Sequence, residues 1–435
     1  MLKRFSLYGF LKNQQYHEPF LVLAFLRMGL SFTLIGVLIG FREIVLNLFE
    51  IPSGAVADLV GRRRSLVFSM LAYIAGFVAL GSAGLLYQAH VSRSWIMVLL
   101  FSGMMATAVG DAFRTGTHKA IIFSWLRLSG RLDERTRVYG FTRSFSKLGS
   151  AASVIIASVL VFVSQNYFYI FFLATIPYII NIVNILGYPA ELEGGVPGRT
   201  SLALVASHMW QTFRRVARRR ELRRLVFESM GFGGFFKAAG GYLQPILQAA
   251  AVPFTAALFT GVAMSSEQRS VILIGPVFVL LFVLSALASF RAHRLVSFLG
   301  HEENAARFLW LLSFLLLTVM AVSMYQGYIT LVIAGFVLLS VLQNLWRPIL
   351  VSRFDNHSSE SSGATILSIE SQGKSFATML LAPLLGFLVD TVYGGSLGAT
   401  PFWPVALIGA VLALLFFLTA PGPRQEQSDH GDMGV

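Results

Sequence analysis

The stretch that decides the fold is residues 54–64, which read Gly-Ala-Val-Ala-Asp-Leu-Val-Gly-Arg-Arg-Arg. Gly54 and Asp58 are four residues apart, so they share one face of a helix. Gly61 suits a helix end that needs a left-handed backbone, and three arginines follow it directly. The pattern predicts a helix that ends in a sharp turn at a basic membrane surface, between two long apolar segments.

The composition of the whole chain indicates an integral membrane protein. Of its 435 residues, 55% are hydrophobic and 13% are charged, and the mean hydropathy is +0.69. A soluble domain is about 25% charged, so an ordinary core does not account for this many apolar residues. One spanning helix takes about 20 apolar residues, so the length accommodates about twelve spans. The apolar runs are continuous rather than alternating, which favours helices over spanning strands.

The distribution of basic residues predicts how the chain lies in the membrane. The net charge is +13, and Lys and Arg gather after the even-numbered spans, as they do in cytoplasmic loops. These basic loops are residues 62–64, 127–137, 214–224, 291–294 and 353. We therefore expect a bacterial inner-membrane protein with both termini in the cytoplasm, in contact with the lipid bilayer and with no nucleic-acid partner.

Two features that the sequence lacks narrow the class of protein further. The chain has no cysteine, which excludes disulfides, thiolate metal ligands and a cysteine nucleophile. The start of the chain carries no small-residue cleavage site after its first apolar run, so we expect this segment to remain as a span.

The apolar runs divide into two sets of six. The spans are expected at residues 5–26, 30–57, 65–87, 94–118, 140–164, 167–188, 225–249, 270–292, 305–325, 328–350, 364–392 and 402–420. This gives an N-terminal six-helix bundle (1–188), a basic cytoplasmic linker (189–224), a C-terminal six-helix bundle (225–420) and a disordered cytoplasmic tail (421–435).

This arrangement, with Gly-x3-Asp-x2-Gly-Arg-Arg between spans 2 and 3, resembles the major facilitator superfamily. The resemblance implies an all-α fold in which two six-helix halves surround a central cavity and rock about a site near the midplane. It also implies that the motif residues latch the cytoplasmic helix ends and so form a cytoplasmic gate; they are Gly54, Asp58, Gly61, Arg62 and Arg63. The corresponding turn of the second half, residues 288–294, lacks the aspartate, and span 5 lacks the Gly-Pro-rich motif of drug–proton antiporters.

Ionisable side chains at membrane depth are costly and therefore mark candidate sites. Span 2 carries Arg42, and Glu43 begins a polar stripe that runs through Glu50 to the turn. For both glutamates a structural role stays open. In span 1, Gln14, His17 and Glu18 are expected on one helix face toward the cavity, where Glu18 or His17 is a candidate proton carrier. The alternative is that Lys12 neutralises Glu18 and Arg42 neutralises Glu43.

Three other spans carry charged candidates. In span 4, Asp111 and Arg114 either bind a planar anionic group or pair with each other. Span 7 carries Glu228, Lys237 and Gln244. In span 11, Glu370 and Lys374 lie four residues apart and either face the cavity or neutralise each other.

Together these features predict a secondary transporter rather than an enzyme. No metal site, cofactor motif or phosphate-binding loop is present, so an ion gradient would drive any concentrating work. The expected cargo is a small polar solute, anionic or zwitterionic, moved by alternating access with protons or by facilitated diffusion, in a monomer. The alternatives are a multidrug or metabolite exporter, a lipid flippase, and a non-transporting sensor or scaffold with the same fold.

Overall fold

The computed structural model describes residues 1–131, 134–193, 207, 210, 214, 216–356, 363–392 and 398–420, except for the side chains of residues 51, 55, 58, 135, 136 and 363–365. The described elements are all helical. Ten of the helices are long and apolar enough to cross a membrane. Two further crossings are made of interrupted helices, α1 with α2 and α10 with α11 and α12, so the described chain accommodates the twelve spans that the sequence predicts.

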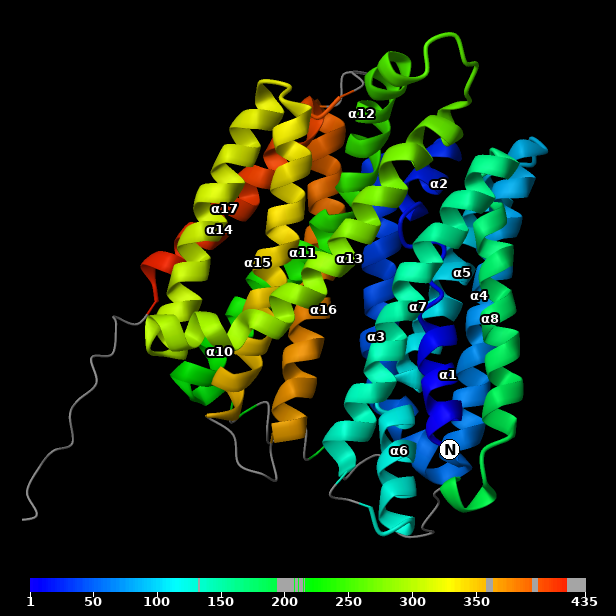
Figure 1. Cartoon of the computed structure of the whole chain (residues 1–435), viewed down its shortest axis with the longest axis vertical. Coiled ribbons are helices and arrows are strands. Elements are labelled where there is room, and N and C mark those ends of the chain that lie inside the picture. The colour runs from blue at the N-terminus through cyan, green and yellow to red at the C-terminus, as the bar shows by residue number, and fades with distance from the viewer. Residues whose placement is uncertain are drawn as a thin grey trace, which may run out of the picture.

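The first half of the chain forms one group of helices and the second half forms another (Figure 1). The N-terminal half contains α1 (Leu2–Lys12), α2 (Leu21–Arg27), α3 (Phe32–Val60), α4 (Arg62–Gln88), α5 (Arg93–Arg114), α6 (Thr117–Leu128), α7 (Arg135–Ser164) and α8 (Tyr169–Leu186). The C-terminal half contains α10 (Arg220–Ser229), α11 (Phe235–Ala239), α12 (Leu243–Leu258), α13 (Ser266–Leu299), α14 (Glu302–Tyr325), α15 (Ile329–Asp355), α16 (Gly363–Val392) and α17 (Trp403–Leu418).

The two ends of the bundle differ in charge. The N-terminus, the α3–α4 turn and α6 lie at one end, which we call the basic side because Arg62, Arg63 and Arg64 stand there (Figure 1). The opposite end, which we call the far side, carries the turn that joins α2 to α3 and the turn that joins α12 to α13. The residues predicted as linker and tail fall mostly outside the described ranges, apart from a short 3-10 turn at Ala190–Leu192 and the start of α10.

Helices α3 and α16 hold the two halves together toward the far side. A Cβ on Gly36 would lie 2.2 Å from the carbonyl oxygen of Ala382, and one on Gly386 would lie 2.2 Å from that of Phe32. Only glycine permits backbones to approach this closely. At Gly54, near the basic end of α3, an added Cβ would meet nothing within 4 Å. The glycine contacts between the two helices that require close approach therefore lie toward the far side.

The first span is broken, and the prediction of one continuous helix over residues 5–26 is wrong. Helix α1 ends at Lys12 and α2 begins at Leu21, and turns occupy the residues between them. Consequently Gln14, His17 and Glu18 do not share a helix face. Pro19 has no backbone N–H and so cannot donate the hydrogen bond that would continue a helix. The polar side chains before it gain no stabilisation from contact with apolar surroundings.

Two other spans are also interrupted. The predicted fourth span ends early, because α5 stops at Arg114 and Gly116 adopts a positive φ of 82° before α6 begins. The seventh span contains a π-helical segment at Met230–Gly234 and a 3-10 turn at Gly240–Tyr242. Such interruptions are frequent at functional sites.

The motif turn has the predicted shape. Helix α3 ends at Val60, and Gly61 has a φ of 108°, which favours glycine. The arginines that follow bind within their own half: Arg63 donates to the Tyr188 carbonyl at 2.9 Å, and Arg64 pairs with Glu193 at 3.1 Å. The Arg62 side chain donates to the Ser124 hydroxyl at 2.8 Å. The side chain of Asp58 lies outside the described residues.

Candidate functional site

A cavity of about 610 Å³ lies between the two halves. It is large enough for a small organic molecule, since ligand pockets commonly span about 300–1,000 Å³. Both halves contribute charged residues to its wall: Glu18, Arg42, Glu43, Asp111, Lys147, Lys237 and Lys374. Four cations and three anions therefore face one cavity.

Aromatic side chains form much of the remaining wall. The N-terminal half contributes Tyr73, Phe77 and Tyr178, and the C-terminal half contributes Phe236, Phe278, Phe282 and Phe336. Amides and hydroxyls stand among them, including Gln343, Asn344 and Ser285. A wall of this kind suits a solute that has both an apolar body and polar groups.

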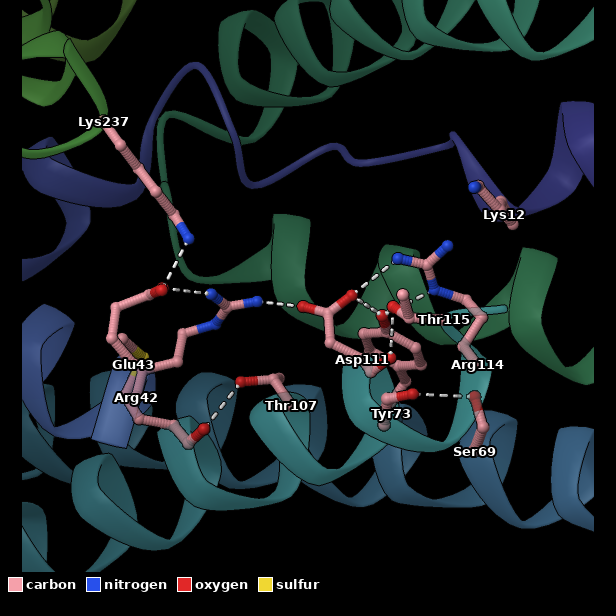
Figure 2. Close-up of polar contacts among 12 residues, drawn as sticks. Lys12, Arg42, Glu43, Ser69, Tyr73, Thr107, Asp111, Arg114, Thr115 and Lys237 are labelled. Atoms are coloured by element: carbon pink, nitrogen blue, oxygen red, sulfur yellow. Dashed lines mark hydrogen bonds and ion pairs between the residues drawn. The ribbon is translucent and has the colours of Figure 1, made fainter. Parts of the chain in front are cut away.

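A chain of ion pairs crosses the cavity from one half to the other (Figure 2). Lys237 of α11 binds the Glu43 carboxylate of α3 at 2.7 Å. The same carboxylate accepts from Arg42 at 3.0 Å, and Arg42 also pairs with Asp111. The Glu43 side chain is fully buried, whereas that of Lys237 is 36% exposed. Lys237 therefore ties the C-terminal half to a buried acid of the N-terminal half.

The chain of ion pairs continues behind the cavity wall. Arg114 of α5 donates to Asp111 at 2.7 Å and to the Tyr73 hydroxyl at 3.1 Å. The Tyr73 hydroxyl also donates to Asp111. Asp111 thus holds two arginines and a tyrosine through its two oxygens. The Asp111–Arg114 pair considered from the sequence is present, although Asp111 shares its charge with Arg42.

Three charged groups of the cavity wall have no such partner. Glu18, Lys147 and Lys374 make no side-chain hydrogen bond or ion pair within the described part of the chain. Lys374 forms no ion pair with Glu370, whose carboxylate accepts from two nitrogens of Arg347 of α15, at 2.6 and 3.0 Å. Glu370 itself is fully buried and does not line the cavity.

The break in the first span presents backbone groups to the opposite half. The side-chain amide of Gln244, on α12, donates to the Glu18 carbonyl at 2.9 Å and accepts from the Val22 N–H at 2.8 Å. His17 lines the cavity and packs on Phe77, with ring centroids 4.9 Å apart. Gln14 turns away from the cavity and donates to the Gly149 carbonyl at 3.2 Å.

Glu228 lies apart from the cavity, at the basic side of the C-terminal half. It accepts from Arg353 at 2.6 Å and from Arg224 at 2.7 Å, and its side chain is 1% exposed. Arg353 also binds Glu303 at 2.7 Å. This cluster therefore joins α10, α14 and α15 in the half whose turn, residues 288–294, lacks the motif aspartate.

Sequence reasoning missed several of these residues. Lys147 and Arg347 received no role, and neither did Asp390, whose carboxylate binds Thr33 of α3 across the two halves. All three residues lie within predicted spans, so their charge at membrane depth was an available signal. The partners of Arg347 and Asp390 were not, because both pairs join residues of different helices.

The sequence profile of the Major Facilitator Superfamily matches residues 13–369. Solved structures share the fold over almost the whole chain. A point mutant of the nucleoside transporter NupG is 14% identical with a TM-score of 0.75, covering 96% of this chain and 99% of its own. A POT family transporter in complex with 5-aminolevulinic acid is 14% identical with a TM-score of 0.67, covering 97% and 96%. The xylose transporter XylE from E. coli is 12% identical with a TM-score of 0.63, covering 98% and 97%. None of the curated proteins matches the chain.

Three observations indicate the same family. The profile matches most of the chain, two groups of helices surround a cavity, and α3 ends at Gly61 in the predicted turn. The chain belongs to the Major Facilitator Superfamily and is an integral membrane transporter of that class.

Proposed function

We propose that this protein moves a small polar solute, anionic or zwitterionic, across the membrane by alternating access. The observation that carries the proposal is the cavity itself: both halves line it, the Lys237–Glu43 pair crosses it, and α3 and α16 pack closely toward the far side. The charged wall supports a polar cargo, and the aromatic wall supports a cargo that also has an apolar body. We propose that the basic side lies in the cytoplasm and that this arrangement of the halves is the inward-facing state.

We further propose that Glu18 carries the coupling proton. Its side chain is exposed to the cavity and has no ion-pair partner within the described residues. A carboxyl group that water reaches from one side at a time is suited to take up and release a proton as the halves move. Lys147 is the charged group that acts on it electrostatically.

Cysteine labelling tests the alternating-access proposal without knowledge of the solute. The natural chain has no cysteine, so Gln343→Cys places a single thiol on the cavity wall. In oriented proteoliposomes, we expect a membrane-impermeant maleimide to label this thiol from the basic side much faster than from the far side. Equal rates from both sides would contradict a cavity that is sealed at the far side.

Transport itself is tested by solid-supported membrane electrophysiology with a panel of carboxylates and amino acids. We expect at least one of them to give a current that a proton-collapsing ionophore reduces and that Glu18→Gln abolishes. Glu221→Gln is the matched control, because Glu221 is exposed on α10 and makes no ion pair with a described residue. A current that survives in Glu18→Gln and in the presence of ionophore would exclude proton coupling through Glu18.

A further inference from the structure

Two cationic side chains of the N-terminal half face each other behind the cavity wall. Lys12 stands at the end of α1 and Arg114 at the end of α5, and Figure 2 shows their nitrogens turned toward the same space. The Arg114 guanidinium repels the Lys12 ammonium, and the Asp111 carboxylate attracts it. Arg143 of α7 adds further repulsion. Two cations, Arg114 and Arg143, and one acid, Asp111, therefore act on the Lys12 ammonium.

Both groups have donors to spare. Arg114 uses Nη2 for Asp111 and Nε for the Tyr73 hydroxyl, and its Nη1 makes no hydrogen bond within the described residues. The Lys12 ammonium makes no hydrogen bond or ion pair within the same part of the chain. Asp111 offers no relief, because its two oxygens already bind Arg42, Arg114 and Tyr73.

This space adjoins the cavity. Asp111 and Tyr73, which bind Arg114, line the cavity, and so does Tyr178, whose hydroxyl donates to the Lys12 carbonyl at 3.4 Å. The Arg114 side chain is 19% exposed and that of Lys12 is also partly exposed, so neither group is closed off from small ions. An ammonium group and a free guanidinium nitrogen match a carboxylate or phosphate in charge and in hydrogen-bond direction.

We propose that Lys12 and Arg114 form a subsite for a small oxyanion group, a carboxylate or a phosphate. Bound there, the anion accepts from the Lys12 ammonium and from Nη1 of Arg114 and offsets their repulsion. Its attachment to the transported solute rests on the proposed transport function, whereas the subsite itself does not. In that case the anionic end of the solute lies beside Tyr178 and its apolar body extends between the aromatic walls.

The competing explanation is that Lys12 serves the helix alone. It stands in the last turn of α1, where a cation is favoured by the carbonyl end of the helix. The two explanations differ in sign. If Lys12 only stabilises α1, replacing it with glutamine lowers the stability of the ion-free protein. If Lys12 instead lies close to Arg114 because the two bind an anion, replacing Lys12 with glutamine removes their repulsion and raises the stability of the ion-free protein.

The test is thermal unfolding of the purified full-length protein in detergent, with sodium phosphate, acetate or benzoate titrated at constant ionic strength against chloride. In the wild type we expect at least one of these anions to raise the unfolding midpoint saturably. In Lys12→Gln we expect a higher midpoint without anion and an apparent dissociation constant raised about tenfold or more, with Lys12→Arg restoring binding. Lys3→Gln is the matched control, because Lys3 is exposed on the same helix.

Each remaining outcome is decisive. Any one of three results would overturn the subsite. The first is that none of the three anions stabilises the wild type saturably. The others are that the anions stabilise Lys12→Gln as much as the wild type, or that Lys12→Gln without anion unfolds at a lower midpoint than the wild type. Benzoate and acetate distinguish the source of the anion. Tighter binding of benzoate supports a solute whose apolar body enters the cavity, whereas equal binding assigns the subsite to a free anion and overturns the link to the solute. The labelling of Gln343→Cys is independent of these results, so failure of the subsite and failure of alternating access are distinguishable.

Discussion

Asp390 of α16 caps the first turn of α3 at Thr33, and the cap crosses from one half of the protein to the other. The Asp390 carboxylate accepts from the Thr33 N–H at 2.7 Å, from the Thr33 hydroxyl at 2.5 Å and from the Phe32 N–H at 3.0 Å. A carboxylate at a helix N-terminus satisfies free N–H groups and complements the helix dipole. Because the acid belongs to the opposite half, we expect the proposed motion that opens the far side to break these bonds.

The first prediction concerns this cap. Asp390→Asn keeps the shape of the side chain but removes its charge, so we expect the closed far side to lose about 1–2 kcal/mol relative to the open one. That loss corresponds to an increase of about five- to thirtyfold in the population open to the far side. The measurement is the rate at which a maleimide applied from the far side labels Gln343→Cys.

Thr391→Ala is the control for this prediction. Thr391 neighbours Asp390 but donates its hydroxyl within its own helix, to the Leu388 carbonyl. We expect no change in labelling from the far side. If Asp390→Asn labels no faster than this control, the cap does not hold the far side closed.

The second prediction concerns the contact between α3 and α16. An alanine at position 386 places its Cβ 2.2 Å from the Phe32 carbonyl oxygen, which is backbone and has little freedom to move. We expect Gly386→Ala to cost the closed contact about 1–3 kcal/mol and to speed labelling from the far side. Gly140→Ala on α7 meets nothing within 4 Å and is expected to leave the labelling rate unchanged. A Gly386→Ala protein that labels like Gly140→Ala would show that the backbones separate without strain.

The third prediction follows from the unequal burial of the Lys237–Glu43 pair. Lys237→Gln leaves Glu43 bound to Arg42, and the lost partner was partly exposed, so we expect a cost below about 1 kcal/mol in the free energy of unfolding. Glu43→Gln leaves Arg42 and Lys237 without their shared anion in a largely enclosed space. We expect it to cost about 1–3 kcal/mol. Thermal unfolding of the two variants measures the difference, and an equal loss in both would contradict it.

The fourth prediction concerns the cluster at the basic side of the C-terminal half. Arg353→Gln removes the central cation, whose side chain is 3% exposed, and leaves Glu228 buried with Arg224 alone. We expect a loss of about 3 kcal/mol in the free energy of unfolding, because a buried acid loses its main partner. Arg294→Gln, at an exposed position on α13, is the control and should unfold like the wild type. A similar midpoint for both variants would assign the cluster no stabilising role.

The sequence predicts the α3–α4 turn well, because its determinants are local. Gly61 at the helix end requires only its own backbone conformation, and the predicted positive φ is present. The number of spans is likewise a local property of apolar length. The break at residues 13–20 escapes prediction because a polar run inside an apolar window is compatible with a continuous cavity-lining helix as well as with an unwound one.

The partners of the charges are not local, and spacing along one helix does not reveal them. Glu370 and Lys374 are four residues apart, yet Glu370 binds Arg347 of another helix. Glu43 binds its sequence neighbour Arg42, which spacing suggested, but also Lys237, which is 194 residues away. Only the packing of the helices decides which of several available cations reaches a given acid.

The side chain of Gln244 has a consequence for the motion of the halves. The two groups that it binds, the Glu18 carbonyl and the Val22 N–H, are separated by four residues and are the two groups that a continuous helix would join to each other. The side-chain amide of Gln244 therefore replaces one backbone hydrogen bond that a continuous helix would have at this position. Withdrawal of Gln244 would free both groups to bond directly, so the span can rewind with no net loss of backbone hydrogen bonds. The Val22 N–H would then keep a hydrogen-bond partner in both arrangements, the Gln244 side chain in one and the Glu18 carbonyl in the other.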